Sequence, residues 1–229
     1  MARPRYPKQD GTRPDALPPE TRTVGQLVAE TLRLYGRRFW ASVPLGIPVA
    51  AADQLSLGRP VQTRILVLIV LAPLFTFAYS VAVRISTPEK PSTRALIVAL
   101  ATGAVIFLPA AFFFPWFALA AVAWLGFAGL VVPVAMIEGA APVAAVGRAF
   151  RLARADYIHA LGSLATLVIV FVLTRLALGL LLQSQADNTL RIAVFLADLV
   201  LSPILFLGAA LLYFDQVARV VVSGSRKRQ

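Results

Sequence analysis

The sequence predicts an all-α membrane protein, a polytopic bundle of about six transmembrane helices with two amphipathic helices at the membrane interface. The first observation is composition: the 229 residues are 59% hydrophobic and 14% charged, whereas soluble domains average about 45–50% apolar and about 25% charged. The second is that apolar residues form runs of the roughly 20 residues that a helix needs to cross a bilayer. These runs are too long and too uniformly apolar for the strands of a membrane barrel, and helices satisfy their own backbone polar groups in lipid.

The chain divides into three parts. Residues 1–22 are rich in proline and charge and lack the apolar core of a signal peptide. A segment of this composition buries too little apolar surface to offset its ordering entropy, so we expect a disordered cytoplasmic tail. Residues 23–220 form the predicted transmembrane helical domain, and residues 221–229 form a short basic cytoplasmic tail.

The first amphipathic helix is predicted over residues 23–38. Thr23 and Gln26 fit a capping box, in which each side chain satisfies a free backbone N–H of the first turn. Apolar residues recur at helical spacing on one side, and Arg33 and Arg37 lie on the other. The pattern is typical of a helix that lies along the cytoplasmic interface. An ordinary helix packed on the protein itself is the alternative.

The second amphipathic helix is predicted over residues 141–158, where Pro142 suits the first helical position. Its apolar side is expected to carry Val143, Val146, Phe150 and Tyr157. Its basic side, together with that of the first helix, is expected to contact lipid headgroups through five arginines: Arg33, Arg37, Arg148, Arg151 and Arg154.

Six apolar segments follow the first amphipathic helix. The weakest is 39–57, which contains Pro44, Gly46 and Pro48. The 43-residue stretch 95–137 carries no formal charge and is twice the length of one crossing. It therefore predicts a hairpin of two spans that turns at Phe114-Pro115-Trp116. The remaining spans are expected over residues 65–83, 160–182 and 192–213.

The distribution of Lys and Arg predicts the orientation of the bundle. With six crossings, eighteen of these residues fall on one side, in the N-terminal region, the second and fourth loops and the C-terminal tail. The other side has three, namely Arg59, Arg64 and Arg191. The asymmetry predicts that both termini are cytoplasmic.

Three charged residues fall inside the predicted spans: Asp53, Arg175 and Asp198. Charges inside a membrane are costly and are functional hypotheses by default. Arg175 and Asp198 lie at similar depth in the outer halves of adjacent antiparallel helices, so we expect them to pair, or Arg175 to pair with Asp53. Such a pair could only fix helix register, or Arg175 could extend outward to the interface.

Three further polar residues are expected at the cytoplasmic interface. Glu138 precedes the second amphipathic helix, where a carboxylate complements the helix dipole; it could instead receive Arg148 or Arg151, or bind a cationic substrate. His159 could titrate near neutrality, but a headgroup contact is the expected role. Asp215 is expected to be an interfacial charge near the end of the last helix.

Three stretches carry a family resemblance: TVGQLVAETLRLYGRRFW at 23–40, VVPVAMIEGAAPVAAVGRAFRLARADYIHALGSL at 131–164 and LLYFDQVARV at 211–220. Together they resemble the membrane domain fused to some glycerophosphoryl diester phosphodiesterases, and related multi-pass proteins of actinobacteria. The resemblance implies a bacterial plasma membrane location. It implies no catalytic residues, because the family has none in its membrane part.

The sequence favours a non-enzymatic membrane scaffold or accessory subunit that binds anionic inner-leaflet lipid or protein partners. The acidic residues are scattered singly, there is no phosphate-binding or zinc motif, and we expect no cofactor, metal or nucleic-acid partner. The alternative is a small transporter or lipid flippase that uses the intramembrane polar cluster of Asp53, Arg175 and Asp198. A membrane-bound lipid enzyme ranks third.

Overall fold

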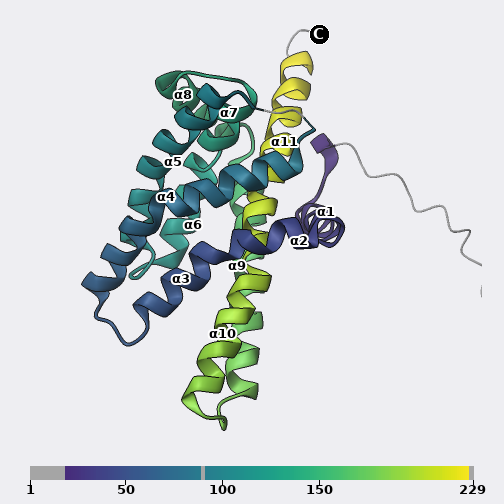
Figure 1. The fold of residues 1–229 in the computed structure, drawn as a ribbon. Helices are drawn as coiled ribbons and strands as arrows, with labels where there is room; N and C mark the ends of the chain where they lie inside the picture. Colours follow the sequence, from purple (N-terminus) through teal and green to yellow (C-terminus); the bar gives the residue numbers. More distant parts are fainter. Residues whose placement is uncertain (1–18, 89–90, 227–229) are drawn as a thin grey trace, which may run out of the picture.

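The computed structural model describes residues 19–88 and 91–226, and within them every regular element is helical. The predicted all-α fold is therefore confirmed (Figure 1). In chain order the elements are η1 (Pro19–Thr21), α1 (Val24–Arg37), α2 (Phe39–Ser42), η2 (Val43–Gly46), α3 (Ile47–Ser56), α4 (Val61–Ser86), α5 (Thr93–Phe113), α6 (Ala118–Ala128), α7 (Val131–Ile137), α8 (Pro142–Ala155), α9 (Tyr157–Leu181), α10 (Asp187–Leu201) and α11 (Pro203–Arg226).

Five helical stretches of the described chain are long and apolar enough to cross a membrane. The predicted hairpin over 95–137 is confirmed, because α5 ends at Phe113 and α6 begins at Ala118. Two of the five stretches are interrupted, one between α6 and α7 and one between α10 and α11. The five are Val61–Ser86, Thr93–Phe113, Ala118–Ile137, Tyr157–Leu181 and Asp187–Val221.

The segment expected as the first span does not form one long α-helix. It is divided into α2, the 3₁₀ turn η2 and α3, because Pro44 and Pro48 lack the backbone N–H that a continuous helix would use. Gly46 lies so close to α10 that a Cβ there would overlap the backbone of Leu199. The break therefore accompanies close packing of this segment on α10.

This broken segment nevertheless runs from one end of the bundle to the other. Before it, Arg22 contacts Asp215 in the middle of α11. After it, the Gln54 side chain donates to the carbonyl of Arg191 at the start of α10. In Figure 1 the α9–α10 turn and the C-terminal end of α11 lie at opposite ends of the molecule. The broken segment and the five long stretches thus make six passes.

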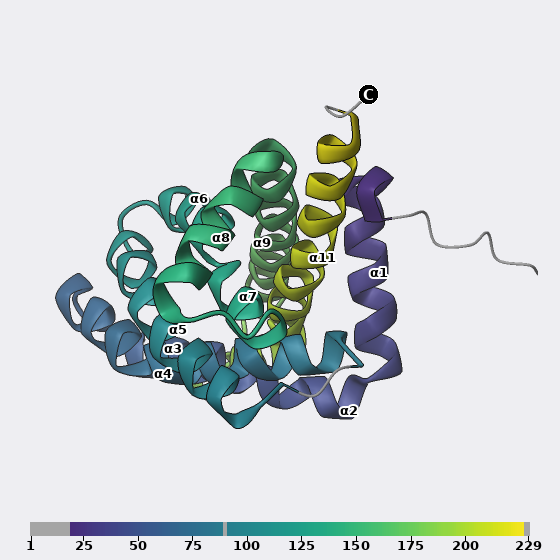
Figure 2. The same ribbon diagram turned by 90° about the horizontal axis from the view of Figure 1, so that it is seen from above.

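The bundle has two ends, which we call the basic end and the opposite end. The basic end comprises η1, α8 and the last turns of α11, and the opposite end comprises the α3–α4 and α9–α10 turns (Figure 1). Figure 2 views the bundle from above, with α1 on the outside beside α11. Among the described residues of the Lys and Arg count, Arg148, Arg151 and Arg154 lie at the basic end, and Arg59, Arg64 and Arg191 lie at or next to the turns of the opposite end.

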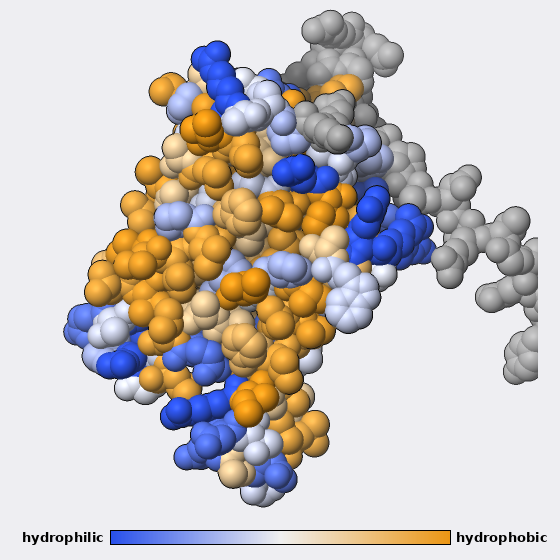
Figure 3. Space-filling model, viewed as in Figure 1, coloured by the Kyte–Doolittle hydropathy of each residue, from blue (hydrophilic) through white to orange (hydrophobic). Residues whose placement is uncertain are grey.

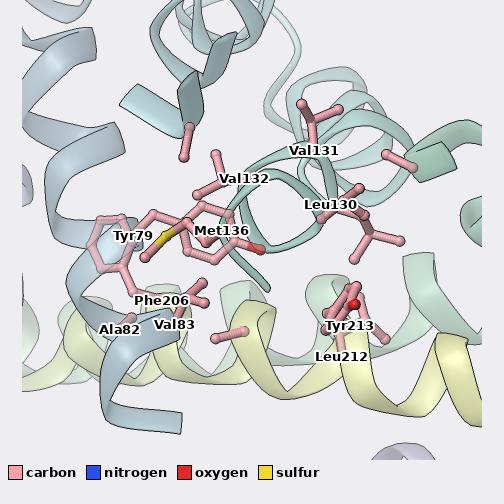
Figure 4. Close-up of a cluster of buried hydrophobic side chains, with 14 of the residues drawn as sticks. Tyr79, Ala82, Val83, Leu130, Val131, Val132, Met136, Phe206, Leu212 and Tyr213 are labelled. Atoms are coloured by element: carbon pink, nitrogen blue, oxygen red, sulfur yellow. The ribbon is translucent and has the colours of Figure 1, made fainter. Parts of the chain in front are cut away.

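The centre of the bundle is α7. Its residues from Val131 to Met136 are all buried, and Figure 4 shows it beside α4 and α11, with Tyr79 and Phe206 on the side of Met136. Gly103 of α5 permits a close crossing, because a Cβ there would overlap the side chains of Thr76 and Val132. By contrast, α9 buries little of its apolar surface inside the molecule.

The outer surface is apolar around the middle of the bundle. In Figure 3 hydrophobic side chains cover most of the middle of this face, and hydrophilic ones gather toward the ends and around α1. Soluble monomers rarely expose apolar patches larger than a few hundred Å², so this surface fits a protein surrounded by lipid. Its exposed residues include Leu66, Val70, Val105, Leu119, Leu173 and Leu196.

Both amphipathic helices form and their inner faces pack on the bundle, but the second ends at Ala155, and Tyr157 and Ile158 of the predicted range belong to α9. In α1 the Thr23–Gln26 capping box is present, and Leu27 and Thr31 are fully buried. In α8 the buried residues are Ala145, Ala149, Leu152 and Ala153, whereas Val143 is 87% exposed. The surface of α8 that packs on the bundle thus consists mainly of alanines, and Val143 lies on its outer surface.

Candidate functional site: ionic clusters at the two ends of the bundle

The three intramembrane charges meet in one cluster near the opposite end. Arg175 of α9 lies between two carboxylates, with Nη2 3.1 Å from Asp53 Oδ1 of α3 and Nε 3.2 Å from Asp198 Oδ1 of α10. The predicted pairing of Arg175 is thus confirmed with both candidate partners. The guanidinium also lies over Phe171, 5.8 Å from the ring centroid, within the range of a cation–π contact.

The cluster is uneven in burial and in charge. Asp198 is fully buried, whereas the side chains of Arg175 and Asp53 are 29% and 27% exposed. Neither oxygen of Asp198 has a well-aligned hydrogen bond, so its contact with Arg175 is an ion pair without a directed N–H. Two carboxylates share one guanidinium, which leaves capacity for a further proton or cation.

The arginines expected at lipid headgroups lie mainly on outward faces. Arg33, Arg37, Arg151 and Arg154 are exposed. Arg33 also contacts Glu30 one turn earlier, at 3.4 Å. The other three make no ion pair within the part of the chain that the structure describes. These four guanidinium groups lie on the outer surfaces of α1 and α8.

Arg148 is the exception among the five, because it binds Glu138. Its Nε lies 3.2 Å from Glu138 Oε2, and the hydroxyl of Tyr213 donates to Oε1 at 3.0 Å. The expected Glu138–Arg148 contact is confirmed. Glu138 also lines a small hollow with Thr87 and Ser92, at the basic end of the bundle.

A second ionic cluster lies at the basic end, and sequence reasoning did not assemble it. Arg22 Nη1 lies 2.7 Å from Asp215 Oδ1. Arg219 Nη1 lies 2.6 Å from Asp156 Oδ2, and its Nη2 donates to the carbonyl of Arg22 at 2.7 Å. The cluster joins the η1–α1 link, the α8–α9 junction and α11. Residues 1–18 of the expected tail lie outside the described residues, but Arg22 is held in place.

The expectations for His159 and Asp215 as separate interfacial contacts were wrong. Asp215 is fully buried and the His159 side chain is 9% exposed. Their Nε2 and Oδ2 atoms lie 3.6 Å apart. Asp156 caps α9 by accepting from the backbone N–H of His159, and the imidazole of the same residue lies against Asp215 of α11. The sequence signal that could have found the pair was the similar distance of both residues from the basic ends of their predicted spans.

Comparison with known proteins adds no relative: no protein family model, curated protein or solved structure matches this chain. The chain thus has a partly exposed ionic cluster around Arg175 at the opposite end and a buried ionic cluster around Asp215 at the basic end.

Proposed function

We propose that this chain is a non-enzymatic protein of the bacterial plasma membrane that binds anionic inner-leaflet lipid and serves as a scaffold or accessory subunit. The observation that carries the proposal is the set of outward-facing arginines on α1 and α8, two helices whose inner faces pack on the bundle. Each Lys or Arg near an anionic membrane surface adds about 1 kcal/mol of attraction.

The proposal includes an orientation. The basic end faces the cytoplasm, so that both termini are cytoplasmic, because Lys and Arg in short loops are retained on that side. Trp40 of α2 is 84% exposed next to α1, and exposed tryptophans favour the membrane–water interface. Its position supports an α1 that lies at the level of the headgroups.

Quenching of Trp40 by brominated lipid tests the lipid preference. The full chain, with Trp116 and Trp124 replaced by Phe, is reconstituted with brominated phosphatidylglycerol or brominated phosphatidylcholine. We expect stronger quenching by the anionic lipid, and we expect this preference to fall with added salt because mobile ions screen exposed charges. Equal quenching by both lipids contradicts the proposal.

The matched variants separate a local effect from net charge. Arg33→Gln/Arg37→Gln removes two exposed arginines beside Trp40, and Arg59→Gln/Arg64→Gln removes two exposed arginines from the opposite end. We expect only the first variant to lose the preference for anionic lipid. Equal losses in both variants would show that overall charge, and not the α1 surface, attracts the lipid.

The second candidate is a small transporter or lipid flippase that uses the cluster of Asp53, Arg175 and Asp198. It is favoured by one observation, the buried Asp198 carboxylate without a directed hydrogen bond. A lipid-scrambling or substrate-uptake assay in vesicles tests it. Activity lost in Asp198→Asn and retained in Glu138→Gln would support the transporter, and no activity in the native chain counts against it.

The resemblance to the membrane domain of glycerophosphoryl diester phosphodiesterases is consistent with an accessory role. In that family a membrane bundle accompanies a separate catalytic domain, so the bundle itself needs no catalytic residues. Because of this resemblance we propose that the chain binds a membrane-protein partner. Cross-linking in whole cells, followed by purification of the chain, tests whether such a partner is bound.

A further inference from the structure

In the contact between His159 and Asp215, both facing atoms are buried and neither has a hydrogen bond. Asp215 Oδ1 is bound by Arg22 at 2.7 Å, but Oδ2 has no hydrogen-bond partner. His159 Nε2 also has none, although the two atoms are 3.6 Å apart and both are buried. Buried polar atoms without partners cost about 1–3 kcal/mol each. A single proton between these two atoms would satisfy both.

The charges around this pair are balanced when the histidine is neutral. The charged side chains that face it are Arg22 from the η1–α1 link, Asp156 from the α8–α9 junction and Arg219 from α11. The other described charges on the helices around α9 and α11 do not face the pair. Some form ion pairs elsewhere: Glu30 with Arg33, Glu138 with Arg148, and Asp198 and Asp53 with Arg175. The rest are exposed: Arg37, Arg64, Arg84, Arg151, Arg154, Asp187 and Arg191.

We infer that His159 and Asp215 form a proton-binding site that fastens the N-terminal segment to α11. His159 Nε2 takes a proton from water, and the new N–H donates a hydrogen bond to Asp215 Oδ2. Arg22 remains bound to Oδ1. The carboxylate is then held from both sides. No other bond forms or breaks, and loss of the proton to water reverses the step.

The position of Arg22 links this proton to the chain before α1. Its guanidinium binds Asp215 and its carbonyl accepts from Arg219, which in turn binds Asp156 at the start of α9. Orientation of the Asp215 carboxylate by protonated His159 therefore orders Arg22 and the first turn of α1. A histidine changes charge between about pH 5 and 8, so the segment should be held more tightly at the acidic side of neutrality.

The chain is well suited to a test because His159 is its only histidine. The full-length protein in lipid nanodiscs is analysed by hydrogen–deuterium exchange at about pH 5.5 and about pH 8, corrected for the chemical exchange rate. We expect the backbone amides of residues 22–27 to exchange about tenfold faster at the higher pH, the effect of losing one hydrogen bond to a charged group. Amides in α7 serve as the internal reference.

Two variants and one direct measurement decide the result. His159→Gln should remove the pH dependence, and Glu30→Gln, which removes an exposed ion pair of α1, should retain it. If amide exchange at residues 22–27 still depends strongly on pH in His159→Gln, the inference is overturned. If that variant does not fold, nuclear magnetic resonance of the single imidazole in the native chain decides: a ring that keeps the same charge throughout this pH range also overturns it.

Discussion

Arg22 and Asp215 are 193 positions apart in the chain, yet Arg22 Nη1 and Asp215 Oδ1 are 2.7 Å apart. The contact joins the residue before the first helix to the last helix. Between Arg22 and Asp215 lie the broken segment α2–η2–α3 and the first four long apolar stretches, and Asp215 belongs to the fifth. With the broken segment counted as a pass the chain makes six, and its described N-terminal segment lies against α11.

Asp215→Asn should destabilise the protein strongly. Removal of one partner from a buried ion pair leaves an uncompensated charge and costs about 3–5 kcal/mol, and Arg22 is only 12% exposed in this pair. The measurement is thermal unfolding in mild detergent. Glu30→Gln breaks the exposed Glu30–Arg33 pair and should cost less than about 1 kcal/mol. Equal effects of the two substitutions would mean that the Asp215 pair is not a buried constraint.

Arg175 and Asp198 should show coupled losses of stability. Arg175→Leu leaves two carboxylates without their cation, and Asp198→Leu leaves Arg175 with Asp53 alone. An isolated charge in a membrane span costs about 2.5–3.5 kcal/mol at the centre and less near the interface. We expect Arg175→Leu to have the larger effect and the double variant to recover part of the summed loss. A double variant as unstable as the sum of the singles would show that the two residues do not interact.

Gly46 should not tolerate a side chain. A Cβ at this position would overlap the Leu199 backbone, and overpacking of a close contact costs about 1–3 kcal/mol. We therefore expect Gly46→Ala to lower the unfolding temperature. Gly179→Ala is the matched control, because nothing lies within 4 Å of a Cβ there and alanine favours a helix interior. If Gly46→Ala is as stable as its control, η2 does not pack on α10 as described.

Much of this fold could be predicted from the sequence because its signals are local. A charge-free stretch twice the length of one crossing requires a turn, and the turn lies at the predicted Phe114-Pro115-Trp116. The Thr23–Gln26 box fixes the start of α1 within its own first turn. The pairing of Arg175 was also predictable, because an arginine at that depth needs an anionic neighbour.

The basic-end cluster could not be assembled in the same way, because its members come from distant parts of the chain. Arg22 belongs by composition to a polar tail, and nothing near it in sequence indicates Asp215. In α8 the hydrophobic pattern favours Val143, but close helix packing selects Ala145 and Ala149, whose small side chains let the backbones approach. Such choices depend on the neighbouring helix and not on the pattern itself.

Cysteine labelling in intact cells tests the six-pass orientation most directly, and the chain has no native cysteine to interfere. Ala155→Cys at the end of α8 and Ser184→Cys in the α9–α10 turn are both at exposed positions. A membrane-impermeant maleimide should label Ser184→Cys in intact cells, and Ala155→Cys only after permeabilisation. The reverse pattern, or equal labelling of both without permeabilisation, would contradict a bundle whose basic end and two termini face the cytoplasm.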